Sequence, residues 1–133
     1  MNKIELIQKT KELNFQTGEY AVFGSALLCI WGIRDSKDID IIVNKNLWER
    51  CLTSGEWTSG KALSGADKLE KENIEIFREW NPGKFDPNEL IKSANIIEDV
   101  PFVDVKYLLE WKKLMGREKD ISDIELIEGY LNK

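Results

Sequence analysis

The chain has 133 residues, of which 42% are hydrophobic, with a formal net charge of -5 and no histidine. This length accommodates one hydrophobic core, so we expect a single domain over residues 1–133, and the apolar content argues against a disordered chain. The acidic balance disfavours a protein that wraps nucleic acid, and the lack of histidine excludes His-based catalysis and His-ligated zinc.

The first half of the chain alternates between helical and extended patterns. An amphipathic opening helix is expected to end between residues 14 and 18. Residues 20–23 predict a short strand that stops at a tight turn, followed by an uncharged helical segment. A β-branched run over residues 38–43 predicts a buried strand, and a helix through residues 47–51 is expected to stop at residues 54–55.

The second half begins with a polar stretch, residues 56–73, which we assign loosely to a hairpin or loop. The later patterns predict, in chain order, a strand over 74–77, a turn over 81–83, a short helix from 87, an extended segment over 95–103, a helix over 105–115 and a last amphipathic helix through 121–131. The order of these elements predicts an α+β fold, a small mixed β-sheet with helices packed on it.

The N-terminal residues mix charged and apolar side chains and lack the apolar centre of a secretory signal. The longest weakly charged stretch, residues 20–33, is too short to span a bilayer. Cys29 and Cys51 stand alone, and Cys29 is expected to be a buried free thiol. We therefore expect a cytoplasmic protein without a membrane segment.

Two carboxylates, Asp38 and Asp40, lie two residues apart in the predicted strand. Because side chains alternate across a strand, both point to one side while the core lies on the other. Two like charges side by side need a cation or solvent to compensate them, and Mg²⁺ is typically held by one or two carboxylates plus substrate phosphates. The pattern therefore indicates a Mg²⁺ site. The alternative is that Asp38 is solvent-exposed and Asp40 pairs with a basic residue such as Arg34.

The turn upstream of these carboxylates contains Gly24 and Ser25. Gly24 permits a tight turn and a close approach of the backbone to a ligand. Ser25 offers a hydroxyl and a backbone N–H at a helix N-terminus, where anions bind. The alternative interpretation of Ser25 is an ordinary helix N-cap.

Together, AlaValPheGlySer at 21–25, a gap of twelve residues and AspIleAspIle at 38–41 resemble the signature of the polymerase-β-type nucleotidyltransferase superfamily. The polar loop before the aspartates is similar to the loop of that family. Residues 100–109, together with residues 112–124, resemble more weakly the closing helices of small bacterial nucleotidyltransferase-like proteins related to the abortive-infection AbiEii group.

The resemblance implies a nucleotidyltransferase-like fold and Mg²⁺-dependent transfer of a nucleoside monophosphate from a nucleoside triphosphate to an acceptor hydroxyl. It places catalytic and metal-binding roles on Asp38, Asp40 and, from the neighbouring predicted strand, Glu75. In the scheme that the resemblance implies, Asp38 and Asp40 bridge two Mg²⁺ ions, one holding the triphosphate and the other lowering the pKa of the attacking hydroxyl, and Glu75 ligates the second ion or accepts the proton. It places phosphate-binding roles on Gly24, Ser25, Lys37 and Lys119. The acceptor, whether small molecule, RNA or protein, is not defined by the sequence.

Three features keep other interpretations open. Arg117 and Lys119 either reach the triphosphate or join Asp120 and Asp123 in a charge network. The arginine that often follows Gly-Ser in the family is replaced by AlaLeuLeu, and we expect no second domain that would position an acceptor. A non-catalytic domain that binds a nucleotide or a protein partner, in a toxin-antitoxin or regulatory pair, is therefore the second hypothesis. A third is a chance match, which predicts that Glu75 lies far from both aspartates.

Overall fold

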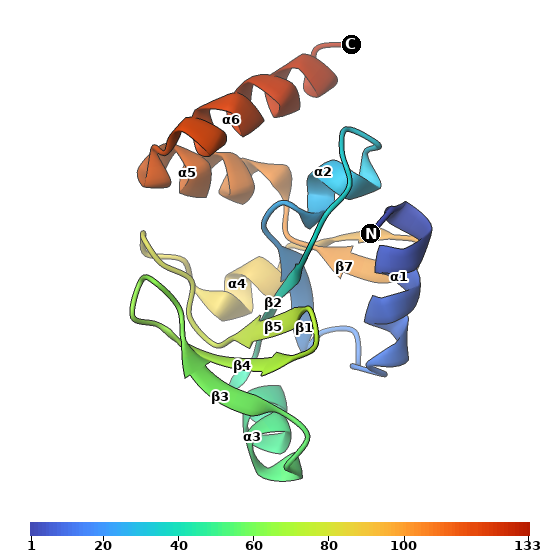
Figure 1. The fold of residues 1–133 in the computed structure, drawn as a ribbon, viewed down its shortest axis with the longest axis vertical. Coiled ribbons are helices and arrows are strands. Elements are labelled where there is room, and N and C mark those ends of the chain that lie inside the picture. Colours follow the sequence, from blue (N-terminus) through green and yellow to red (C-terminus); the bar gives the residue numbers. More distant parts are fainter.

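A computed structural model describes residues 1–133 and contains six α-helices and one seven-stranded mixed β-sheet (Figure 1). The helices are α1 (Lys3–Glu12), α2 (Ala26–Ile30), α3 (Lys45–Ser54), α4 (Pro87–Lys92), α5 (Val105–Met115) and α6 (Glu118–Leu131). The strands are β1 (Tyr20–Phe23), β2 (Ile39–Val43), β3 (Thr58–Lys61), β4 (Asp67–Lys71), β5 (Ile74–Phe77), β6 (Asn95–Ile97) and β7 (Val100–Phe102). The predicted α+β class with a mixed sheet is confirmed.

The strand order is β3-β4-β5-β2-β1-β7-β6. At the centre of the sheet, β2 pairs antiparallel with β1 and parallel with β5. The segments between residues 56 and 73 and between 95 and 103 both form antiparallel hairpins, β3–β4 and β6–β7, which occupy the two edges. The loose assignment of residues 56–73 is thereby resolved as a hairpin.

Local sequence signals account for most helix ends. Asn44 and Asp104 cap α3 and α5, because their side-chain oxygens accept hydrogen bonds from backbone N–H groups of the first turn. Pro87 occupies the first turn of α4, where its missing N–H costs nothing. Helices α3 and α5 end at Gly55 and Gly116, whose left-handed φ values of 77° and 62° suit glycine.

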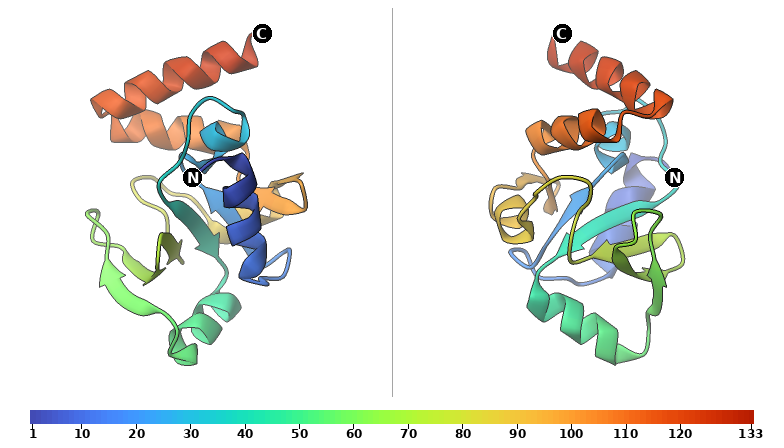
Figure 2. Two further views of the ribbon diagram at one scale, coloured as in Figure 1. Left: turned by 45° about the vertical axis from the view of Figure 1, so that its right-hand side comes forward. Right: turned by 90° about the vertical axis from the view of Figure 1, so that its left-hand side faces the viewer.

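The core lies around the two central strands and α2. Every residue of β1 and of α2 is buried, and in β2 only Asp40 is partly exposed. The hairpin of α5 and α6 lies at one end of the molecule beside α2, and α3 lies at the opposite end (Figures 1 and 2). Cys29 and Cys51 are both buried and free. None of the helices has the length and apolar character that crossing a membrane requires.

Candidate active site

The strand register brings the three predicted carboxylates to one place. Asp40 in β2 lies directly opposite Glu75 in the parallel strand β5, and Asp38 precedes Asp40 by two residues. All three line a pocket of about 410 Å³. Glu75 therefore does not lie far from the two aspartates, contrary to the prediction of the chance-match interpretation.

The loop before Asp38 is held by hydrogen bonds. The buried Ser36 hydroxyl donates to the Asp38 carbonyl oxygen at 2.8 Å, and the Asn73 side-chain amide donates to the Lys37 carbonyl oxygen at 3.2 Å. Asn73 directly precedes β5, so one contact ties the loops that lead into both carboxylate-bearing strands. The Lys37 side chain itself is exposed, at the rim of a second pocket on the side of Gly24 and Ser25.

The environment of Asp40 raises the pKa of its carboxyl group. Burial first, and then the charge of Glu75, a hydrogen bond with Glu75 and the charge of Asp38, raise the pKa of Asp40 to about 7. The cluster thus holds more negative charge than its surroundings neutralise. A cation beside Asp40 would relieve this repulsion, which is the physical property expected of an oxygen-ligand site for a hard divalent ion.

Gly24 leaves the space that Asp40 occupies. Its φ is +81°, and a Cβ atom at this position would lie 3.1 Å from Asp40 Oδ2. Both a left-handed backbone and the close approach of a carboxylate therefore favour glycine here. The predicted turn is confirmed, and its role is to bring the β1–α2 connection against the Asp40 side chain.

Ser25 does not act as the ordinary N-cap considered from the sequence, because its side chain makes no capping hydrogen bond. Its Oγ lies instead 3.5 Å from the Nζ of Lys112 in α5. Helix α2 has only five residues, so a strong anion site from its N-terminus alone is not expected. An anion near Ser25 would interact more strongly with the surrounding cationic side chains, such as Lys112, than with the N-terminus of this short helix.

A second pocket, of about 550 Å³, adjoins the carboxylates on the side of Gly24 and Ser25. Its basic lining residues are Arg34, Lys37, Lys112, Arg117 and Lys119. Asp38 and Asp40 line both pockets, as do Trp111, Arg117 and Lys119. The carboxylates therefore lie between a basic pocket and a pocket with a more apolar wall.

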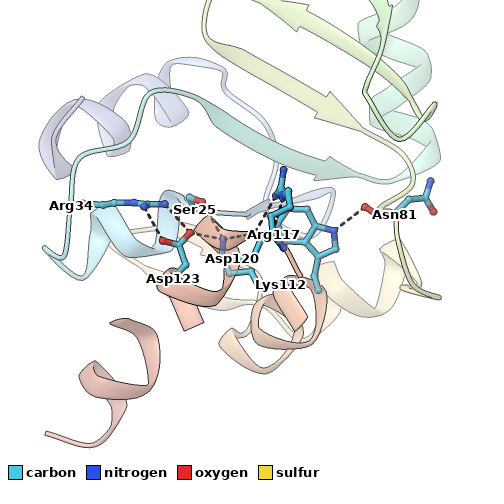
Figure 3. Close-up of polar contacts among 8 residues, drawn as sticks. Ser25, Arg34, Asn81, Lys112, Arg117, Asp120 and Asp123 are labelled. Atoms are coloured by element: carbon cyan, nitrogen blue, oxygen red, sulfur yellow. Dashed lines mark hydrogen bonds and ion pairs between the residues drawn. The ribbon is translucent and has the colours of Figure 1, made fainter. Parts of the chain in front are cut away.

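An ion network with a buried centre adjoins the basic pocket, as shown in Figure 3. Lys112 Nζ donates to Asp123 Oδ2 at 2.8 Å and lies 3.7 Å from Asp120 Oδ1, with only 2% of its side chain exposed. Arg34 forms a two-point ion pair with Asp123 at 2.8 and 2.9 Å. Arg117 pairs with Asp120 at 2.6 and 3.1 Å. The network ties α5 and α6 to the loop between α2 and β2.

Paired hydrogen bonds stabilise the charged forms within this network. Burial by itself raises the pKa of Asp120, but the hydrogen bonds from Arg117 and the charges of Arg117 and Lys112 outweigh it and leave that pKa lowered. The hydrogen bond to Asp120 raises the pKa of Arg117. Asp120 therefore remains ionised together with its cationic partners.

The network revises two expectations. Arg34 pairs with Asp123 and not with Asp40, so the alternative that neutralised Asp40 with Arg34 is wrong. Of the two cations predicted to reach a triphosphate or join the network, Arg117 joins it, while Lys119 is exposed at the pocket rim. Sequence reasoning missed Lys112, although it follows Leu108 by four residues on the buried stripe of α5 and so signals a buried lysine.

Trp111 forms the wall between the two pockets. Its indole Nε1 donates to the Asn81 carbonyl oxygen at 2.8 Å, and its ring lies 5.3 Å from that of Trp80. The hydrogen bond and the ring contact fix the orientation of a side chain that remains partly exposed. A planar ligand group beside the carboxylates would meet a rigid aromatic surface.

Asp38 and Asp40 suit a Mg²⁺ ion that is held jointly by protein carboxylates and the phosphates of a substrate. No group of three or more acidic or cysteine side chains lies ready to hold a metal ion by itself. Mg²⁺, however, is commonly held by one or two carboxylates plus substrate phosphates and water, and not by an all-protein cage. Asp38 and Asp40 supply such a donor pair next to the basic pocket, whereas Glu75 is engaged by Lys68 at 2.6 Å.

Comparisons with protein-family models, with curated proteins and with solved structures found no match for this chain.

Proposed function

We propose that the chain is a Mg²⁺-dependent nucleotidyltransferase of the polymerase-β-type superfamily, similar to the small bacterial proteins related to the AbiEii group. The observation that carries the proposal is the register of β2 and β5, which sets Asp40 opposite Glu75 beside the Gly24–Ser25 turn. The two halves of the sequence signature, the Gly24–Ser25 turn and the Asp38–Asp40 pair, thus lie together beside Glu75. The substrate is a nucleoside triphosphate, and the acceptor is a hydroxyl group.

The basic pocket suits the triphosphate. Three cations at its opening, Lys37, Arg117 and Lys119, and the Ser25 hydroxyl face the same space as Asp38 and Asp40. Lys112 and Arg34 are held by Asp123 and give the wall a fixed positive charge. Positioning and charge neutralisation supply most of the catalysis in phosphoryl transfer, so such a preorganised wall is the relevant feature.

The adjoining pocket suits the acceptor. In-line attack places the acceptor hydroxyl opposite the leaving pyrophosphate, and this pocket lies on the other side of the shared carboxylates. The hydroxyl oxygen bonds to the α-phosphorus, the bond from that phosphorus to the α,β-bridging oxygen breaks, and pyrophosphate leaves with the electron pair. Glu75 is positioned to take the hydroxyl proton.

Asp38 and Asp40 would hold the Mg²⁺ ion. When bound, Mg²⁺ would neutralise phosphate charge on the triphosphate. The chain's own residues then orient the phosphates against the wall of Arg117 and Lys112 and hold the acceptor against Trp111.

The test uses an α-labelled nucleoside triphosphate with a cell extract separated into small molecules, RNA and protein. We expect Mg²⁺-dependent transfer of the label to one fraction, and loss of that transfer in Asp40→Asn. The matched control is Asp99→Asn, because Asp99 lies on the exposed β6–β7 turn, where its φ of +67° also suits asparagine. Full activity of folded Asp40→Asn would contradict the proposal, as would a label transfer that is independent of Mg²⁺.

A second candidate function, a non-catalytic nucleotide- or protein-binding domain such as a toxin-antitoxin or regulatory component, draws on one observation. Glu75, the third carboxylate, is engaged by Lys68. Calorimetry with ATP and GTP, with and without Mg²⁺, separates the two candidates when combined with the label transfer. Nucleotide binding without any transferred label supports the second candidate.

A further inference from the structure

A row of carboxylates crosses the sheet beside the proposed site. Glu70 in β4 lies directly opposite Glu75 in β5, and Glu75 lies directly opposite Asp40 in β2. In an antiparallel pair such as β4–β5, directly opposed residues have their Cβ atoms about 4.5–5.5 Å apart, so like charges there destabilise a sheet. Three acidic residues in three neighbouring strands therefore need a positive charge on the same face.

Lys68 supplies that charge from within the sheet. It lies two residues before Glu70 on the same face of β4, and its Nζ lies 2.6 Å from Glu75 Oε1 and 3.1 Å from Glu70 Oε1. Its side chain is 16% exposed, much less than the other lysines that form ion pairs in this hairpin. The ammonium group is thus held between two carboxylates of the row.

The neighbouring edge strand is shaped around this arrangement. Gly60 in β3 lies opposite Lys68, and a Cβ atom at this position would lie 3.1 Å from Glu70 Oε1 and 3.5 Å from Lys68 Cε. A larger residue would press on both members of the ion pair. The absence of a side chain at Gly60 therefore leaves room beside β3 for the Lys68 and Glu70 side chains that form the ion pair.

We propose that the Lys68 ammonium is a permanent cation in the carboxylate row, that it stands where a second divalent ion would otherwise neutralise Glu75, and that the site binds one divalent ion. This inference rests on the proposed function. Asp38 and Asp40 hold the single ion together with the triphosphate, and Lys68 neutralises and orients Glu75. Lys68 is a positioning residue, because it acts on the reaction through Glu75.

The Lys68 ammonium and a divalent ion differ in charge and in the groups that they can bind. An ammonium group carries one positive charge and three donors, whereas a divalent ion carries two charges and can accept the oxygen of an acceptor hydroxyl as a ligand. With Lys68 in place, no second ion lowers the pKa of that hydroxyl. Removal of its proton then depends on the Glu75 carboxylate that Lys68 orients.

The primary test counts metal ions and does not depend on activity. Crystals of the wild-type chain are soaked with Mn²⁺ and a nonhydrolysable nucleoside triphosphate, and anomalous difference density locates the ions. We expect one Mn²⁺ peak, at Asp38 and Asp40, with Lys68 still on Glu75. A second peak on Glu75 in the wild type would overturn the inference.

Variants give the complementary measurement. In Lys68→Gln the charge that excludes a second ion is gone, so we expect a second Mn²⁺ peak at Glu75 and a second binding event in solution titration. The matched control is Lys71→Gln, because Lys71 lies on the opposite face of β4 and pairs with Glu56. Control and wild type should both bind one ion. Folded Lys68→Gln with one ion would overturn the inference, and if this variant fails to fold, the wild-type count decides.

The outcomes separate the two proposals. Two ions in the wild type refute the role of Lys68 and leave the nucleotidyltransferase assignment standing. No Mn²⁺ bound in the presence of the triphosphate refutes both the metal-dependent function and the inference. One ion at Asp38 and Asp40 without any label transfer from a nucleoside triphosphate supports the role of Lys68 in a non-catalytic nucleotide-binding domain.

Discussion

Replacing Asp40 by asparagine is expected to make the protein more stable at neutral and alkaline pH in the absence of divalent ions. Burial and the neighbouring carboxylates raise the pKa of Asp40 from 3.8 to about 7 in the folded protein. Below about pH 4 the group is protonated in both the folded and unfolded chains, and no penalty arises. Between about pH 4 and 7 the unfolded chain ionises first, so stability falls as the pH rises.

The size of the effect follows from the pKa difference. Each unit corresponds to about 1.4 kcal/mol, so the roughly three units between the unfolded and folded values set an upper limit of about 4 kcal/mol, reached above pH 7. Asparagine at position 40 stays neutral and avoids this penalty. Near pH 5 the expected difference in the free energy of unfolding is about 1 to 2 kcal/mol, again as an upper limit.

Urea unfolding from pH 5 to 8.5 in the presence of a chelator measures the free energy of unfolding of both proteins. We expect the advantage of Asp40→Asn to grow with pH, while Asp99→Asn follows the wild type because Asp99 is exposed. A constant difference between wild type and Asp40→Asn across this range would refute the account of Asp40. So would an asparagine variant that is less stable at pH 8.

The remaining predictions concern the turn and the buried network. Gly32→Ala should lower the free energy of unfolding by about 1 to 2 kcal/mol because of the left-handed φ of +74° alone, since no atom lies within 4 Å of the added Cβ. Gly24→Ala should lower it by more, because its added Cβ also meets Asp40 Oδ2 at 3.1 Å. Equal losses in urea unfolding would contradict the proposed crowding. Lys112→Met should lower the free energy of unfolding by about 3 to 5 kcal/mol, because it leaves buried carboxylates without their cation. The exposed Lys113→Met should lose no more than about 0.5 kcal/mol, and similar thermal unfolding of both variants would argue against a buried network.

Local patterns in the sequence predicted most elements of the fold. Apolar periodicity, capping residues and the glycines after α3 and α5 act within a few residues, so the helix over 105–115 and its end at Gly116 are confirmed. The β-branched run in β2 likewise indicated a buried strand. The polar stretch 56–73 resisted prediction because β3 has no apolar alternation and its residues are mostly exposed at an edge.

In the candidate site, too, some features were predictable from the local sequence and others only from the tertiary structure. The sequence determined the residue types, the close spacing of Asp38 and Asp40, and the tight turn at Gly24, because spacing along the chain and glycine conformation are local properties. The predicted strand began at residue 38, whereas β2 begins at Ile39 and the exposed Asp38 lies just before it. The strand register decided that Glu75 lies opposite Asp40, and the packing of α5 and α6 decided that Lys112 and Arg34 meet at Asp123. Asp40 and Glu75 are 35 positions apart in the sequence, and Arg34 and Asp123 are 89 positions apart. Pairing across such separations is fixed only when strands and helices pack against a common core.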